Sequence, residues 1–222
     1  MRSTDGLFAS LDKAGTRYLV IGGLAVVLHG APRFTTDVDL ILDLSPEEAG
    51  QGIRALTAFG LLPRAPVDAR NFANPSIRRT WQREKHMQVF SLFDPEDPLC
   101  LIDLSLDEPR PFAELWQRSV EFKVRGALVR TLGIEDLIEL KHASGRAQDL
   151  ADIEELTRLR RRVRPANGPE DATARAEWLE QAQETAFAAG SFASAVERRA
   201  REQAGDWTFL RGLPDPSSGD PA

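Results

Sequence analysis

The 222-residue chain has one cysteine, no long apolar run and no excess of positive charge. An internal disulfide is excluded because Cys100 is the single cysteine, and no Cys and His residues are spaced like zinc ligands. No run reaches the roughly 18 apolar residues that a membrane span needs, and the first residues lack the apolar stretch of a secretion signal. These absences predict a cytoplasmic protein.

The formal net charge of −6 argues against a protein that coats nucleic acid non-specifically, because that role favours a basic surface. One local exception is the segment 158–164, RLRRRVR, which has five arginines in seven residues. It has two interpretations. Its cations either lie in solvent near the negative end of a helix dipole, or they form a phosphate-binding patch.

Apolar spacing and turn residues predict strands that alternate with helices. Strands are expected at 17–21, 37–42, 87–93, 99–106, 121–125 and 128–131. Helices are expected before Gly15 and at 24–29, 46–59, 112–118, 134–143 and 148–159, whereas 61–83 shows no clear pattern. This order predicts an α/β (α+β) fold, with a mixed β-sheet flanked by helices.

The composition changes near residue 164, where RPANGPE carries two prolines, a glycine and an asparagine. We therefore expect one domain over residues 1–164 and a linker at 165–171. Residues 172–210 are rich in Ala, Glu, Gln and Arg with an apolar stripe, which predicts a C-terminal helical extension. Residues 211–222 are expected to be a disordered tail.

Two acidic residues, Asp37 and Asp39, stand inside an apolar strand. Alternate side chains of a strand point to the same face, so the two carboxylates lie side by side while Val38 and Leu40 point into the core. Unpaired, they would repel each other and one pKa would rise. Mg²⁺ prefers oxygen ligands and commonly binds one or two carboxylates together with substrate phosphates, which makes it the expected partner.

A third carboxylate is expected from Asp103, which lies in the middle of the apolar run LCLIDL. An aspartate in such a run is costly unless it has a partner. Gly22 and Gly23 end a buried strand and open a helix. A Gly-Gly pair at that point is either a tight turn or a place where backbone N–H groups accept a phosphate.

The combination of strand, Gly-Gly, short helix and RFTTDVDL resembles the signature of the DNA polymerase β-like nucleotidyltransferase superfamily. Within it, the chain is most similar to the minimal nucleotidyltransferases and the AbiEii-type toxin group, in which GGLA leads through an arginine and threonines into the aspartate pair. The later segments FAELWQR, GIEDLIELK and RAQDLADI continue the resemblance. It covers about residues 7–159, so residues 1–164 are expected to be a nucleotidyltransferase domain.

The resemblance implies a role for each matching residue. Gly22 and Gly23 would contact the nucleotide phosphates, and Asp37, Asp39 and Asp103 would bind two Mg²⁺ ions. Lys141 would be a phosphate clamp in catalysis, and Asp149, the second matching residue of the late segments, would take part in nucleotide binding. Asp149 also has a plain structural interpretation, as a negative charge at the start of the last helix.

Two residues just before the aspartate pair keep alternative roles. Arg33 would bind the triphosphate, or it pairs with Asp37 or Asp39. Thr36 would bond a phosphate or a metal-bound water, or it is strand filler. Gln148 stands where many members of the group have a cation, so one phosphate contact of the family has no counterpart here.

The expected function is transfer of a nucleoside monophosphate from an NTP to an acceptor, with release of pyrophosphate. The acceptor would be RNA such as a tRNA end, a hydroxyl of a cognate partner protein, or, with least support, an aminoglycoside-like molecule. The setting would be a toxin–antitoxin or phage-defence system. The alternative is a catalytically inactive nucleotide-binding or toxin–antitoxin interaction module.

Overall fold

The computed structural model describes residues 4–33, 35–124 and 127–163. The expected linker, helical extension and tail at 165–222 lie outside the described residues. Within the described ranges, no helix is both long and apolar enough to cross a lipid bilayer.

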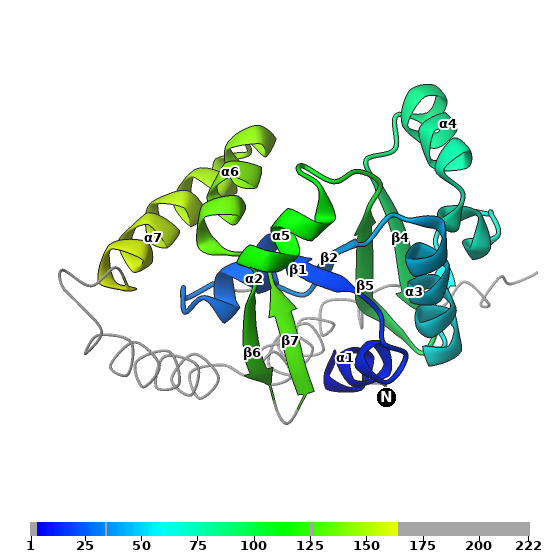
Figure 1. The fold of residues 1–222 in the computed structure, drawn as a ribbon, viewed down its shortest axis with the longest axis horizontal. Helices are drawn as coiled ribbons and strands as arrows, with labels where there is room; N and C mark the ends of the chain where they lie inside the picture. Colours follow the sequence, from blue (N-terminus) through cyan, green and yellow to red (C-terminus); the bar gives the residue numbers. More distant parts are fainter. Residues whose placement is uncertain (1–3, 34, 125–126, 164–222) are drawn as a thin grey trace, which may run out of the picture.

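A single mixed sheet organises the described residues, with strand order β3-β4-β5-β2-β1-β7-β6 (Figure 1). Its strands are β1 (Tyr18–Ile21), β2 (Val38–Leu42), β3 (Leu62–Pro63), β4 (Val89–Asp94), β5 (Asp97–Ser105), β6 (Val120–Val124) and β7 (Ala127–Thr131). The pairs β1–β7 and β2–β5 are parallel, and the other neighbours are antiparallel. The predicted fold class, a mixed sheet flanked by helices, is confirmed.

Helices connect and flank these strands. They are α1 (Thr4–Lys13), α2 (Gly22–Leu28), α3 (Pro46–Phe59), the 3₁₀ helix η1 (Ala69–Ala73), α4 (Pro75–Lys85), α5 (Phe112–Arg118), α6 (Ile134–Ser144) and α7 (Ala147–Val163). The limits of α3 are those predicted, because Pro46 begins the helix and Gly60, at φ 107°, ends it in the left-handed conformation. Figure 1 shows α6 and α7 side by side at one end of the molecule and α4 at the other.

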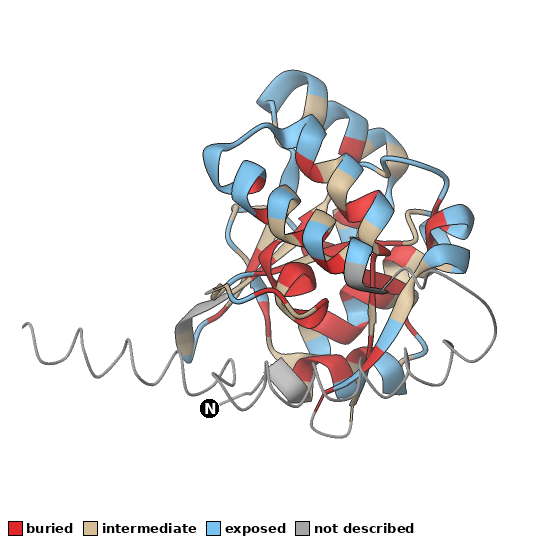
Figure 2. Ribbon diagram, turned by 90° about the vertical axis from the view of Figure 1, so that its left-hand side faces the viewer, coloured by how far each residue is buried: buried red, intermediate tan, exposed pale blue. Residues whose placement is uncertain are grey.

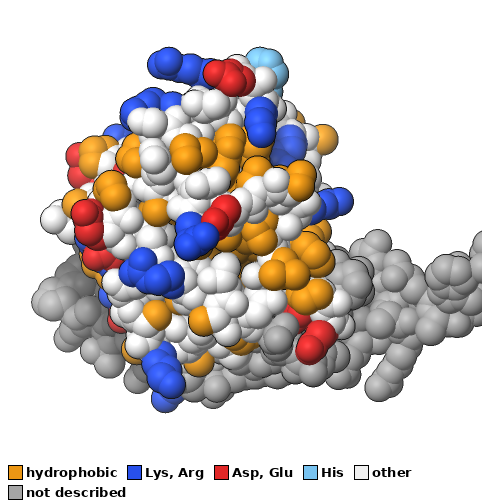
Figure 3. Space-filling model, turned by 90° about the vertical axis from the view of Figure 1, so that its right-hand side faces the viewer, with side chains coloured by type: hydrophobic (Ala, Val, Ile, Leu, Met, Phe, Trp, Pro, Cys, Tyr) orange, Lys and Arg blue, Asp and Glu red, His pale blue; other side chains and the backbone are white. Residues whose placement is uncertain are grey.

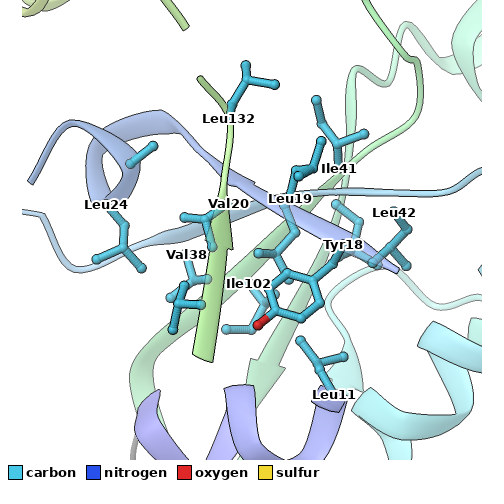
Figure 4. Packing of buried hydrophobic residues seen from close by; sticks show 14 of the residues in the cluster. Leu11, Tyr18, Leu19, Val20, Leu24, Val38, Ile41, Leu42, Ile102 and Leu132 are labelled. Atoms are coloured by element: carbon cyan, nitrogen blue, oxygen red, sulfur yellow. The ribbon is translucent and has the colours of Figure 1, made fainter. Parts of the chain in front are cut away.

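The core lies around the central strands and the inner sides of the helices. Val20, Leu40 and Ile102 are fully or almost fully buried, and α1 contributes Leu11 beneath Tyr18 (Figure 4). Figure 2 shows buried residues concentrated in the interior, with exposed residues on the outer turns of the helices. This packing holds β2 and β5 beside each other and so fixes the positions of the side chains on these strands that point away from the core.

Candidate active site

Asp39 and Asp103 are direct neighbours on two parallel strands. The register pairs Val38 with Ile102, Asp39 with Asp103 and Leu40 with Leu104. Residues paired across adjacent strands point to the same face, and the strands are about 4.8 Å apart, so the two carboxylates share one surface.

Asp37 extends this group from the residue before β2. Its side chain is exposed, whereas Val38 is 1% and Leu40 0% exposed, so the alternation predicted from the sequence is confirmed. Together, Asp37, Asp39 and Asp103 are called the carboxylate cluster below. Their predicted roles in metal binding stay predictions.

Charge repulsion within the carboxylate cluster is visible at Asp39. Burial, followed by the negative charges of Asp103 and Asp37, raises the pKa of Asp39 to about 6. The positive charge of Arg146 and a hydrogen bond from the backbone N–H of Gly23 act in the opposite direction. The cluster therefore favours a positively charged ligand.

The two glycines have a structural reason of their own. Gly22 has φ +64°, and a Cβ at this position would lie 1.9 Å from Oδ2 of Asp39. A Cβ on Gly23 would lie 2.7 Å from Oγ1 of Thr35 and 2.9 Å from Cζ of Arg33. The turn thus seats the Asp39 carboxylate directly on bare backbone. The predicted contact of these glycines with phosphate stays a prediction.

Arg33 and Thr36 take up different positions around this turn. The Thr36 hydroxyl donates to Oδ1 of Asp37 at 3.1 Å, which orients that carboxylate. The guanidinium of Arg33 donates through Nη1 to Oδ2 of Asp152 at 2.5 Å. The interpretation that Arg33 pairs with Asp37 or Asp39 is therefore wrong, because the guanidinium forms its ion pair with Asp152 on α7.

Lys141 lies in a buried ion-pair network rather than on an open surface. Its side chain is 5% exposed, and Nζ donates to Oδ1 of Asp149 at 3.1 Å and to Oδ2 of Asp152 at 2.6 Å. These bonds join α6 to α7, and Asp149 stands in the first turn of α7. The ammonium therefore has two donors engaged, and its role as a phosphate clamp stays a prediction.

Two residues of this region were not predicted from the sequence. Asp152 is 4% exposed and joins Arg33 to Lys141. Arg146, between α6 and α7, is 80% exposed and close enough for its charge to lower the pKa of Asp39. The three-residue spacing of Asp149 and Asp152, on one face of a helix that follows Lys141, was the available signal.

A pocket of about 430 Å³ adjoins the network. It is lined by Val26, Ala31, Pro32, Arg33, Gln148, Ala151, Asp152 and Glu155. Its volume falls in the range of small-molecule sites. Arg33 borders both this pocket and the glycine turn, so it is placed between a cavity and the carboxylate cluster.

The fit of the carboxylate cluster to Mg²⁺ lies in its donor chemistry. Among the described side chains, no three or more His, Cys, Asp or Glu residues form a ready metal cage. Mg²⁺ does not require one, because it commonly completes its shell with waters and substrate phosphates. All donors of the cluster are oxygens, and the pKa of Asp39 is raised first by burial and then by the neighbouring carboxylates, whose repulsion a cation would relieve.

Comparison with known proteins gives no family assignment. No family model matches the chain, and no curated protein matches it. Among solved structures, the lincosamide antibiotic adenylyltransferase LnuA with bound lincomycin has 18% identity and a TM-score of 0.44, over 67% of this chain and 90% of that chain.

Two further structures resemble the chain at a comparable level. The complex of ANT(2")-Ia with adenylyl-2"-tobramycin has 16% identity and a TM-score of 0.44, over 82% of this chain and 93% of that chain. An antigenic nucleotidyltransferase-like protein from Paracoccidioides brasiliensis has 17% identity and a TM-score of 0.47, over 87% and 89%. Similarity at this level does not transfer a function, so the proposal below rests on the geometry of the site.

Proposed function

We propose that this chain is a Mg²⁺-dependent nucleotidyltransferase that moves a nucleoside monophosphate from an NTP to a hydroxyl acceptor. The observation that carries the proposal is the pairing of Asp39 with Asp103 across β2 and β5, with Asp37 beside them. Three carboxylates on one face have little structural use, since they repel one another. They suit a reaction in which cations and a polyphosphate meet.

Asp37, Asp39 and Asp103 would hold Mg²⁺, which when bound would gather the triphosphate, lower the pKa of the acceptor hydroxyl and stabilise the transition state. The exposed guanidinium of Arg146, which pairs with Asp149, lies near enough to lower the pKa of Asp39 and suits a triphosphate oxygen. Asp152 and Lys141 fix Arg33 over Gly23. The Thr36 hydroxyl keeps Asp37 oriented.

The reaction balances without a further cofactor. The acceptor oxygen forms a bond to the α-phosphorus, and the bond from that phosphorus to the bridging oxygen of the β-phosphate breaks. Pyrophosphate leaves with the electron pair. The acceptor proton passes to solvent or to the carboxylate of Asp103. Positioning and charge stabilisation therefore supply most of the catalysis.

For the acceptor we propose RNA, with a hydroxyl of a partner protein as the next candidate. Membership of the AbiEii-type group and a role in toxin–antitoxin or phage-defence systems remain predictions from the sequence resemblance. Growth arrest after induction of the wild-type chain, absent with Asp39→Ala, would support a toxin. Normal growth in both cultures would contradict that role.

The proposed activity is tested by incubating the protein with Mg²⁺, each labelled NTP and cell extract. Label that nuclease removes identifies an RNA acceptor, and label that protease removes identifies a protein acceptor. Asp37→Ala and Asp39→Ala should each lower transfer at least about 100-fold, the scale of losing a key charge stabiliser. Asp107→Asn is the matched control, because Asp107 is an exposed acid just beyond β5. Equal transfer by Asp39→Ala and wild type would end the proposal.

The rival function is a binding module without catalysis. Calorimetric titration of wild-type protein with each NTP, in the presence and absence of Mg²⁺, separates the two. Metal-dependent NTP binding that Asp39→Ala abolishes supports the enzyme. The absence of any NTP binding, together with no labelled product, favours an interaction module.

A further inference from the structure

Helix α4 is a basic element that is rigidly anchored to the domain. It carries four basic residues and one acidic residue, and lies at the end of the molecule away from α6 and α7 (Figure 1). Arg78 is 5% exposed and donates to the carbonyl of Leu44 at 2.7 Å. Trp81 is buried and stacks on Phe90 with ring centroids 5.2 Å apart. The opposite side of α4 is thereby held toward solvent.

That outer side presents cations that lack acidic partners. Arg79 and Arg83 are exposed and four residues apart, so they are neighbours on one helix face, about 6 Å apart along the axis. Among the described residues, neither they nor Lys85 form an ion pair, and Arg79 bonds only to the Ser76 hydroxyl. Other exposed arginines of the described residues do form ion pairs.

Three of those other arginines, Arg70, Arg118 and Arg158, are each paired with a carboxylate. Their charge is neutralised locally, whereas that of α4 remains available to a ligand. Figure 3 shows Lys and Arg side chains at the top of this face, where α4 lies, interspersed with acidic and histidine side chains, and hydrophobic side chains lower down. Arg79, Arg83 and Lys85 therefore form a positive ridge on a chain whose net charge is −6.

The chemistry of the ridge favours phosphates over a protein surface. Its exposed positions are Ser76, Arg79, Thr80, Arg83, Glu84 and Lys85, without an exposed aromatic or aliphatic side chain. Protein interfaces depend on buried aromatic and apolar anchors, which this face does not offer. Guanidinium groups match phosphate oxygens in two-pronged geometry, and hydroxyls add further donors.

The ridge also adjoins the strand that carries Asp103. The Gln82 side chain on α4 donates through Nε2 to the carbonyl of Leu106 at 3.3 Å. Leu106 follows Asp103 by three residues, which is about 10 Å along an extended chain. In the parallel register with β2, Leu106 lies beyond Asp103 on the side away from Asp37, so a polynucleotide bound on α4 would run about 10 Å back along β5 to reach the carboxylate cluster.

We propose that Arg79 and Arg83 of α4 bind the phosphate backbone of the RNA acceptor. This inference rests on the proposed function, because the RNA bound on α4 is taken to be the acceptor of the nucleotide. It assigns the acceptor surface to an element distinct from the triphosphate site. The arginine segment 158–164 is not needed for it, and Arg158 within that segment is already paired with Glu155.

The test measures binding of a fluorescent single-stranded RNA to the full chain by anisotropy, without NTP or Mg²⁺. Wild type should bind with a salt-dependent affinity between about 50 and 200 mM salt. Arg79→Glu/Arg83→Glu should weaken binding at least about tenfold. Arg79→Gln/Arg83→Gln should lower the slope of log affinity against log salt by about 1.4, which is about 0.7 for each lost phosphate contact.

The matched control is Lys13→Glu/Arg54→Glu, which makes the same charge change on exposed side chains of α1 and α3. It should change the affinity less than about twofold. Equal losses in both double variants, an unchanged α4 variant, or a wild type that binds no RNA would each overturn the proposal. Because no nucleotide is present, failure of catalysis leaves this readout unaffected, and thermal unfolding of each variant confirms its fold.

Discussion

The Asp39 carboxylate makes the stability of the folded chain depend on pH. Its carboxylate is held on Gly22, beside Asp103 and Asp37, and its pKa is raised from 3.8 to about 6. Since the pKa in the folded state exceeds that in the unfolded state, the folded state binds the proton more tightly. Stability from this group is present below about pH 4 and is lost as the pH rises through 6. A cation at the cluster would restore it.

Asp39→Asn should therefore stabilise the protein while abolishing transfer. The neutral amide removes the cost of burying a charge as well as the repulsion from Asp103 and Asp37, and it keeps an oxygen to accept from the Gly23 N–H. We expect a gain of about 1 to 3 kcal/mol at pH 8, since one pKa unit corresponds to about 1.4 kcal/mol. Urea unfolding of wild type and variant at pH 8, without divalent ions, measures the difference.

The same comparison at pH 4.5 provides the control. There Asp39 is largely protonated in the folded wild type, so the advantage of the variant should shrink toward zero. Burial also lowers the pKa of His29, so the folded state resists protonation of this residue below pH 6.5. Because His29 is present in both proteins, it does not affect the difference between them. Equal stability at pH 8 would show that the carboxylates do not repel as proposed.

How far single residues could be predicted depends on the range of the interactions that place them. The same-face arrangement of Asp37 and Asp39 follows from strand alternation alone, so it was predictable. Pairing of Asp39 with Asp103 needs the strand order, which the sequence suggested only through the burial cost of Asp103. The bond from Arg33 to Asp152 spans 119 residues and has no local signal.

Among the elements, the α6–α7 pair depends on a buried network that joins it internally and to Arg33. Lys141 contacts Asp149 and Asp152 at the centre of this network, while the largely exposed Arg146 pairs with Asp149 at its edge, with Nε 3.3 Å from Oδ2. We therefore expect Lys141 to act mainly in stability and Arg146 mainly in NTP binding. Substituting Lys141 and Arg146 separately tests the two roles independently.

Lys141→Met should lower the free energy of unfolding by about 3 kcal/mol, because it leaves two buried carboxylates without their main partner. Arg146→Gln should change it by less than about 1 kcal/mol, as expected for an exposed ion pair. In transfer assays, Arg146→Gln should raise the KM for NTP about tenfold, or roughly 1.4 kcal/mol. Denaturant titration and initial rates measure both quantities.

The reverse pattern would revise these assignments. If Lys141→Met keeps wild-type stability and loses NTP binding, Lys141 is the phosphate clamp predicted from the sequence resemblance. Lys141→Arg then serves as the conservative check, because it retains the charge. Unchanged KM in Arg146→Gln would remove that residue from the triphosphate site.

Elements themselves were predictable where capping and apolar periodicity agree. The helix α3 has Pro46 at its start, Gly60 at its end and an apolar face between them. The helix α4 was not assigned, since five of the eleven residues in its sequence PSIRRTWQREK are charged and only two, Ile77 and Trp81, are large and apolar. Its start signal was nevertheless present, because Asn74 caps the helix by accepting from the N–H of Ser76 at 2.9 Å, and Pro75 follows.

For the molecule as a whole, the net charge conceals an uneven distribution. Residues 165–222 contain 10 of the 34 acidic residues and 5 of the 28 basic residues. Residues 1–164 are consequently close to neutral, with 24 acidic and 23 basic residues. The inference from the overall charge of −6 against nucleic-acid binding therefore does not apply to the domain that carries α4 and the carboxylate cluster.

This distribution predicts the behaviour of a chain shortened to residues 1–164. Within the described part of the chain, the core residues lie between Leu7 and Leu159, so the shortened chain should still unfold cooperatively. It should bind the fluorescent RNA more tightly than the full chain at about 50 mM salt, because it loses net negative charge that repels phosphates. The difference should vanish near 1 M salt, where the Debye length falls to about 3 Å. A shortened chain that folds but binds RNA more weakly would place the main RNA contacts beyond residue 164 and not on α4.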